Sequence, residues 1–209
     1  MDKTKIAVSI FNKHANLYQN KFMDVSLYHT TFDFFCDAIE KQNAEVLELA
    51  CGPGNITNYL LKKRPDLKIL GTDLAPNMIE LAKQNNPTAT FSILDCRAIL
   101  SLNKNYNAVM CGFCLPYLSK EETKQLFIDT FKLLTSGGVF YISTMEDDYS
   151  NSGFRKGGQG DEMFMHYYLE RDLNLMLSEI GFKIKTVNRV KSEMTDGNVV
   201  TDLILIAEK

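Results

Sequence analysis

The centre of the chain, residues 44–145, alternates short apolar runs with segments of helical periodicity. The apolar runs cover residues 45–50, 67–72, 89–94, 106–111 and 139–143, and helical patterns lie between them. Strands that alternate with helices form right-handed crossovers, which place the strands parallel in one sheet and the helices on both of its faces. We therefore expect an α/β core with a doubly wound, mostly parallel sheet.

The two flanks of this core carry different patterns. In residues 1–43, Phe11, Ala15, Tyr18 and Phe22 fall at helical spacing, which predicts a helical cover. Residues 168–209 predict a helix and two strands, with Asp196-Gly197-Asn198 as the turn of an antiparallel hairpin. Residues 146–167 are polar and too long for a plain connection, so they predict either a flap over a site or a disordered segment. The whole of 1–209 is expected to be one domain.

Composition narrows the classes of partner and compartment. The chain has 209 residues, with 23 basic and 26 acidic side chains and a net charge of −3, so no broad phosphate-binding surface and no nucleic-acid partner are expected. No apolar run reaches the roughly 20 residues that span a bilayer, and no signal-peptide block opens the chain. Five cysteines are an odd number for a disulfide framework. We expect a cytoplasmic protein without a membrane partner.

Distinctive residues follow four of the predicted strands. They are Cys51-Gly52-Pro53-Gly54, Asp73, Asp95 and Cys111-Gly112-Phe113. Open parallel sheets bind ligands beyond the carboxyl ends of their strands. Glycines let a ligand approach the backbone closely, a carboxylate at Asp73 can accept from a ribose diol, and one at Asp95 can meet an exocyclic amine. The pattern predicts a ligand that contains a nucleoside.

Two residues help to decide whether this ligand is a dinucleotide or a cationic nucleoside. A dinucleotide fingerprint places a third glycine where this chain has Thr57. Glu48 lies in the first strand, beside the turn, where its charge would repel a pyrophosphate and suit a cationic ligand. An NAD-dependent oxidoreductase is therefore disfavoured.

Five segments resemble, in order, the motifs of the class I S-adenosylmethionine-dependent methyltransferases. They are VLELACGPGNIT (46–57), GTDLAPNM (71–78), FSILD (91–95), YNAVMCGFCLPYL (106–118) and LTSGGVFYIS (134–143). The chain's two ends resemble the small-molecule branch of that family more loosely. The resemblance implies a Rossmann-like sheet of seven strands in the order 3-2-1-4-5-7-6, with the last strand antiparallel. It also implies S-adenosylmethionine as cofactor and a small-molecule methyl acceptor.

The resemblance also implies roles for individual residues. Glu48, Ala50, Cys51, Gly52 and Gly54 would surround the methionine portion, and Asp73 would hold the ribose. The remaining predicted cofactor residues are Leu74 and Met78 beside the adenine, Asp95 and Cys96 at its edge, Cys111 and Phe113 near the sulfonium, and Tyr18 and Tyr28 near the carboxylate.

The implied reaction is an in-line displacement at the methyl carbon of the sulfonium. The protein must align nucleophile, carbon and sulfur and exclude water, and it needs a general base only if the acceptor arrives protonated. The catalytic residues stay unknown at this stage, with His166, Tyr167 and His29 as candidates. The accepting atom, O, N or C, is not fixed by the sequence.

Several structural readings compete with the functional ones. Asp95 can instead cap the turn that follows it. Cys111 and Cys114 form a C-x-x-C, but no second pair of Cys or His is spaced for zinc, so no metal site is expected. Cys114-Leu115-Pro116-Tyr117 resembles the N/D-P-P-Y motif of base methyltransferases only in its last two positions. A non-catalytic module that keeps the fold as a binding or regulatory partner is the remaining alternative.

Overall fold

Seven strands form one mixed sheet in the computed structural model, which describes residues 3–157, 159–193 and 199–209. The sheet order is β3-β2-β1-β4-β5-β9-β8. The strands are β1 (Glu45–Leu49), β2 (Lys68–Asp73), β3 (Thr90–Ile93), β4 (Tyr106–Cys111), β5 (Leu134–Met145), β8 (Lys183–Glu193) and β9 (Val199–Glu208). β9 is antiparallel to both its neighbours. Because β6 and β7 lie outside this sheet, its order is the predicted 3-2-1-4-5-7-6.

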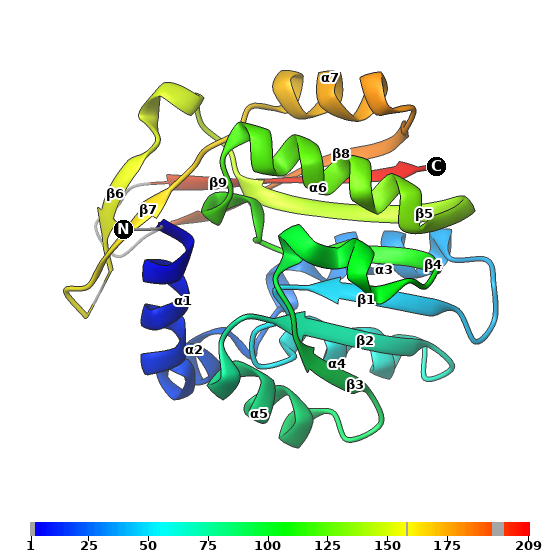
Figure 1. Ribbon diagram of the computed structural model, residues 1–209, viewed down its shortest axis with the longest axis horizontal. Helices are drawn as coiled ribbons and strands as arrows, with labels where there is room; N and C mark the ends of the chain where they lie inside the picture. Colours follow the sequence, from blue (N-terminus) through cyan, green and yellow to red (C-terminus); the bar gives the residue numbers. More distant parts are fainter. Residues whose placement is uncertain (1–2, 158, 194–198) are drawn as a thin grey trace.

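Helices cover both faces of the sheet, and each face has its own core (Figure 1). Helices α3 (His29–Ala38), α4 (Asn55–Lys63) and α5 (Pro76–Asn85) lie on one face, and α6 (Lys120–Leu133) and α7 (Glu170–Ile180) on the other. Alternate residues of a strand point to opposite faces. In β4, for example, Met110 packs with Phe35 of α3, whereas Val109 packs with Phe127 of α6.

A third group of elements stands at the carboxyl ends of the parallel strands (Figure 1). It consists of α1 (Lys3–Lys13), α2 (Ala15–Phe22) and a separate antiparallel hairpin of β6 (Gly153–Lys156) and β7 (Glu162–Met165). Short 3₁₀ turns complete the chain at Ser26–Tyr28, Cys96–Leu102, Leu115–Tyr117 and Tyr149–Asn151. The predicted flap therefore contains a hairpin, and it lies beside α1. The predicted turn at 196–198 lies outside the described residues.

Local signals account for some of the element boundaries. Ser119 and Glu122 form the predicted capping box at the start of α6, and Pro76 occupies the first turn of α5. α6 ends earlier than expected, because Leu134 is already extended and pairs with Tyr106. Within the described part of the chain, no helix combines the length and the apolar character needed to cross a bilayer.

Candidate functional site

A cavity opens where β1, β2, β3 and β4 end, under the cover formed by α1 and α2. The strand ends supply one side, and the amino-terminal helices close the other. Its described lining is Thr4, Ala7, Val8, Phe11, Tyr18, Ala50, Gly52, Asp73, Leu74, Met78, Leu94, Cys96, Gly112, Phe113, Cys114, Tyr117 and Leu118. This is the edge of the sheet at which the sequence predicts the ligand.

The turn between β1 and α4 is shaped by residues with positive φ. Ala50, Gly52 and Gly54 have φ angles of 50°, 54° and 77°. Gly52 lines the cavity, and a Cβ there would meet only the Tyr18 ring, at 3.7 Å. Gly54 has another role, because a Cβ there would lie 2.4 Å from Nδ2 of Asn86 at the end of α5. One glycine therefore exposes backbone to the cavity, and the other lets α4 and α5 approach.

Asp73 ends β2 with its carboxylate at the cavity. Its Oδ2 accepts from the backbone N–H of Gly52 at 3.0 Å, and its Oδ1 accepts from Ala75 at 2.8 Å. Burial raises the pKa of Asp73, and these backbone donors oppose the rise. The carboxylate thus ties the glycine turn to the end of the second strand and still faces the space where a ribose diol would bind.

Glu48 lies beneath the turn and not on the cavity wall. Its side chain is buried, Oε2 accepts from the Thr57 hydroxyl, and Oε1 has no partner among the described residues. Burial raises its pKa to about 8. Thr57 occupies the position of the third glycine in a dinucleotide fingerprint. Here its hydroxyl donates a hydrogen bond to Glu48. This arrangement explains in structural terms why the turn departs from a dinucleotide fingerprint.

The structure brings several predicted cofactor residues together around the cavity. These are Tyr18, Ala50, Gly52, Asp73, Leu74, Met78, Cys96 and Phe113. Asp73 offers the ribose acceptor and Gly52 the open backbone, while Leu74, Met78 and Leu94 supply an apolar surface on the β2–β3 side. The unpartnered Oε1 of Glu48 is a further polar atom under the turn, beneath the expected methionine portion. These residues fit S-adenosylmethionine.

Other predicted cofactor residues serve as supports and do not reach the cavity. Glu48 and Gly54 lie under the turn, as described above. Cys51 packs with Ile79, Ala82 and Phe91 beneath β2, and Cys111 is fully buried in the core below α6. These four residues point into the protein and not into the cavity. They support the turn and the strand end that line it.

Asp95 is bound by the neighbouring Arg97 and lines an adjoining pocket that shares Thr4 and Leu74 with the main cavity. Arg97 bonds to both carboxylate oxygens through its side chain, at 2.7 to 3.0 Å, and donates its backbone N–H to Oδ1 at 2.9 Å. The pKa of Asp95 is lowered, because hydrogen bonds and the charge of Arg97 outweigh burial, which is the largest single effect and acts to raise it. The capping alternative is what the structure shows for this residue.

Tyr28 does not reach the cavity either. Its hydroxyl donates to Oδ2 of Asp202 on β9 at 2.7 Å, and its ring packs against the back of the loop at Phe113, with ring centroids 5.4 Å apart. Tyr28 therefore stands behind a lining residue, and its contact with a cofactor carboxylate stays a prediction.

The three catalytic candidates do not line the cavity. His29 is exposed and stacks on Tyr59, with ring centroids 4.3 Å apart. His166 is buried between Tyr149 and Phe164, and burial lowers its pKa. Tyr167 accepts a hydrogen bond from Arg155 of β6 at 3.3 Å. His166 and Tyr167 directly follow β7 and lie beside the hairpin, whereas His29 begins α3.

Sequence reasoning missed the contribution of the first helix and of the residues after Phe113. Thr4, Ala7, Val8 and Phe11 bring one face of α1 onto the cavity. Tyr117 joins them and stands edge-to-face with Phe11, with ring centroids 5.2 Å apart. The signal was present in the small and apolar residues at positions 4, 7, 8 and 11, which recur at helical spacing.

Two cysteines meet at the cavity wall, although they are not the C-x-x-C pair. The Sγ atoms of Cys96 and Cys114 lie 3.5 Å apart. The contact with Cys114 and burial raise the pKa of Cys96, and the contact with Cys111 and burial raise that of Cys114. No group of three or more metal-ligating side chains is found in residues 3–157, 159–193 and 199–209. Both thiols therefore act as small neutral wall residues.

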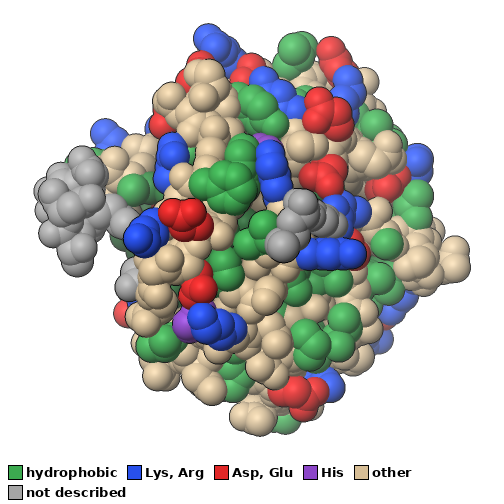
Figure 2. Space-filling view, turned by 60° about the vertical axis from the view of Figure 1, so that its left-hand side comes forward, with side chains coloured by type: hydrophobic (Ala, Val, Ile, Leu, Met, Phe, Trp, Pro, Cys, Tyr) green, Lys and Arg blue, Asp and Glu red, His purple; other side chains and the backbone are tan. Residues whose placement is uncertain are grey.

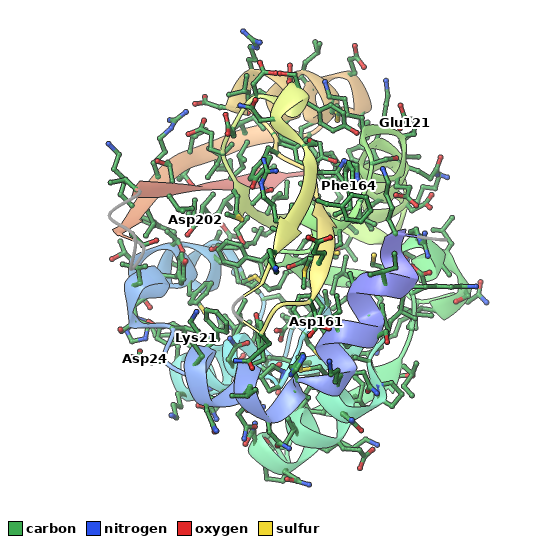
Figure 3. The ribbon with its side chains drawn as sticks, turned by 90° about the vertical axis from the view of Figure 1, so that its left-hand side faces the viewer. Lys21, Asp24, Glu121, Asp161, Phe164 and Asp202 are labelled. Carbon is green, nitrogen blue, oxygen red and sulfur yellow. The ribbon has the colours of Figure 1, made fainter. Side chains whose placement is uncertain are left out.

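A second groove adjoins the cavity between the amino-terminal helices and the hairpin. Phe11 and Tyr18 line both spaces, so they form a shared wall. The remaining groove residues include Ile10, His14, Leu17, Lys21, Phe22, Asp161 and Met163. In Figure 3, Lys21 and Asp161 are labelled on α2 and on the hairpin, on either side of this groove.

Comparison with known proteins gives the family. Residues 46–138 match the family described as methyltransferase domain. The chain belongs to the class I S-adenosylmethionine-dependent methyltransferases. It is 36% identical over 144 residues to a malonyl-[acyl-carrier protein] O-methyltransferase of Acetivibrio thermocellus, which covers 67% of this chain and 49% of the relative.

Two solved structures share the fold of this chain over nearly its full length. Magnesium protoporphyrin IX methyltransferase from Synechocystis PCC 6803 with bound SAH has a TM-score of 0.77 at 17% identity, with 100% of both chains covered. The Burkholderia thailandensis 1,6-didemethyltoxoflavin-N1-methyltransferase has a TM-score of 0.73 at 18% identity, covering 98% of this chain and 88% of the other. By contrast, the match spans only 38–49% of the length of several sequence relatives.

Proposed function

We propose that this chain transfers the methyl group of S-adenosylmethionine to a small-molecule acceptor. The observation that carries the proposal is the Asp73 carboxylate, which faces a glycine-lined cavity at the strand ends and is tied to the glycine turn. When bound, the cofactor supplies an activated methyl group on a sulfonium. The chain's task is then to hold the nucleoside and to exclude water.

The adjoining groove is the proposed acceptor site. It shares Phe11 and Tyr18 with the cofactor cavity, and it lies between the helical cover and the hairpin. Residues 146–167 include the hairpin that lines this groove, which supports their predicted role as a flap over the acceptor. Basic and acidic side chains are interspersed over the face shown in Figure 2, which favours a small molecule over a nucleic acid.

The cavity favours an acceptor that is already nucleophilic at neutral pH. Burial raises the pKa of Tyr18 to about 12 and raises that of Tyr117 as well. The thiols of Cys96 and Cys114 are likewise held protonated. An acceptor that arrives protonated would need His14 in the groove, whose Nε2 lies 2.6 Å from Asp161. The five free cysteines support a reducing compartment such as the cytoplasm.

Calorimetry with ligand-stripped protein tests the cofactor assignment. Asp73→Asn should weaken binding of both S-adenosylmethionine and S-adenosylhomocysteine at least tenfold, because it replaces a charge-assisted acceptor by a neutral one, worth about 1.5–3 kcal/mol. Asp33→Asn, on the exposed face of α3, is the matched control and should bind normally. If wild-type protein gives no heat with either compound, the proposed function is wrong.

Turnover needs a separate test. Purified protein incubated with S-adenosylmethionine and a metabolite library should form S-adenosylhomocysteine only in the wells that contain an acceptor. Cofactor binding without by-product in any well would instead favour the non-catalytic module.

A further inference from the structure

Three aromatic rings pack together in the cavity wall, and the predicted cofactor contacts include only one of them, Tyr18. Phe11 stands edge-to-face with Tyr18, with centroids 5.7 Å apart and planes at 85°. It stands in the same way against Tyr117, at 5.2 Å and 82°. All three residues line the cavity. We call Phe11, Tyr18 and Tyr117 the aromatic box.

The position of Tyr18 relates this box to one part of the cofactor. A Cβ built on Gly52 would lie 3.7 Å from Cε1 of Tyr18, so the ring stands over the glycine turn. Asp73 lines the same cavity as this ring. Asp73 is the proposed ribose ligand, and the turn is the proposed methionine site. The sulfur of the cofactor is the atom that joins these two portions.

The cavity offers the sulfonium no carboxylate besides the one already assigned to the ribose. Asp73 is the single carboxylate among the described lining residues, and backbone N–H groups already bind both of its oxygens. The cysteine thiols and tyrosine hydroxyls on the wall are neutral. The negative faces of aromatic rings attract cations, and most strongly where water is excluded.

Building on the proposed function, we propose that Phe11, Tyr18 and Tyr117 bind the sulfonium cation of the cofactor and distinguish it from the neutral by-product. S-Adenosylhomocysteine has the same ribose and the same methionine-derived chain, but its sulfur carries no charge. It therefore keeps the contacts with Asp73 and the turn and loses the attraction to the rings. The box thus favours exchange of by-product for fresh cofactor.

The test compares the two ligands by calorimetry in the same variants. Phe11→Leu and Tyr117→Leu keep an apolar side chain and remove the ring face. Each should raise the Kd for S-adenosylmethionine about 3- to 30-fold and change the Kd for S-adenosylhomocysteine less than about twofold. Tyr117→Phe, which retains the ring, should restore the preference. Phe154→Leu removes an exposed ring on β6 and serves as the control.

An equal loss of affinity for both ligands in the leucine variants would overturn the aromatic box, because it would mean that the rings only shape the cavity. Failure of wild-type protein to bind either ligand would contradict the proposed function and is a different result. If the leucine variants do not fold, tetramethylammonium chloride is added to wild-type protein. It should weaken S-adenosylmethionine binding more than the same concentration of potassium chloride does, and equal effects would overturn the proposal.

Discussion

At the scale of single residues, the strand ends were the most predictable part of the site. Gly52, Asp73 and Phe113 lie where parallel strands stop, and the geometry of a doubly wound sheet brings such positions to one edge. Asp95 was harder to predict, because its neighbour Arg97 competes for the carboxylate. Which of two polar groups a carboxylate binds depends on side-chain geometry that a pattern of residue types does not contain.

Glu48 leads to a prediction about stability and pH. The folded protein keeps its proton up to about pH 8, whereas an unfolded glutamate releases it near 4.5. The protonated Glu48 carboxyl therefore makes its full contribution to the free energy of unfolding below pH 4.5. This contribution is lost as the pH rises to 8. We expect the free energy of unfolding to fall across this window by on the order of 1 kcal/mol per pH unit from this group.

Denaturant titrations at pH 5, 6.5 and 8 measure this slope. Glu48→Gln should flatten it, because glutamine does not titrate. Glu40→Gln changes an exposed glutamate and should leave it unaltered. Parallel pH profiles for wild type and Glu48→Gln would show that the buried carboxyl does not titrate in this range.

At the scale of elements, periodicity predicted the helices and strands of the core well and their boundaries less well. α6 ends at Leu133 and β5 begins at Leu134, ahead of Gly137-Gly138. The glycines had suggested a helix end, but strand pairing between Tyr106 and Leu134 stops the helix first. A tertiary contact thus overrides a local signal, and such contacts are not visible in a single sequence.

Two glycines with similar backbone angles allow a matched test of helix packing. Gly54 and Gly137 have φ angles of 77° and 71°. A Cβ at Gly54 would meet Asn86 at 2.4 Å and Ala82 at 3.3 Å, whereas a Cβ at Gly137 meets nothing within 4 Å. Gly137→Ala should cost about 1–2 kcal/mol of unfolding free energy from backbone strain alone. Gly54→Ala should cost about 1–3 kcal/mol more, because α4 and α5 must also separate.

Thermal and chemical unfolding of the two variants give this difference. Equal losses would mean that α4 and α5 do not depend on the glycine for their approach. The cofactor affinity of each folded variant separates an effect on the turn from an effect on the helices.

At the scale of the whole molecule, the amino-terminal cover contacts the hairpin across the proposed acceptor groove. Lys13 and His14 both contact Asp161, at 3.2 Å and 2.6 Å, and Lys3 lies 3.4 Å from the centre of the Phe164 ring on β7. Figure 3 shows α1 and the hairpin side by side, with Asp161 and Phe164 labelled. The cavity beneath measures about 120 Å³, whereas ligand sites usually enclose about 300–1,000 Å³. We therefore expect the cover to move when a nucleoside binds.

This arrangement predicts an effect on exchange rates. Asp161→Asn should accelerate release of S-adenosylhomocysteine by about two- to tenfold, because it weakens partly exposed ion pairs worth about 1 kcal/mol together. Stopped-flow displacement measures the rate. Asp33→Asn removes a comparable ion pair with Lys63, away from the groove, and is the control. An unchanged rate would show that the contacts between cover and hairpin do not limit exchange.

The position of the last strand has a consequence for how the molecule is made. β9 lies between β5 and β8, although β8 comes first along the chain. While residues 199–208 are still inside the ribosome, β5 has an open edge and β8 has no neighbour to join. The sheet can therefore close only after residues 199–208 have left the ribosome. A chain released before that point would present a long, apolar strand edge to other chains and would be prone to aggregate.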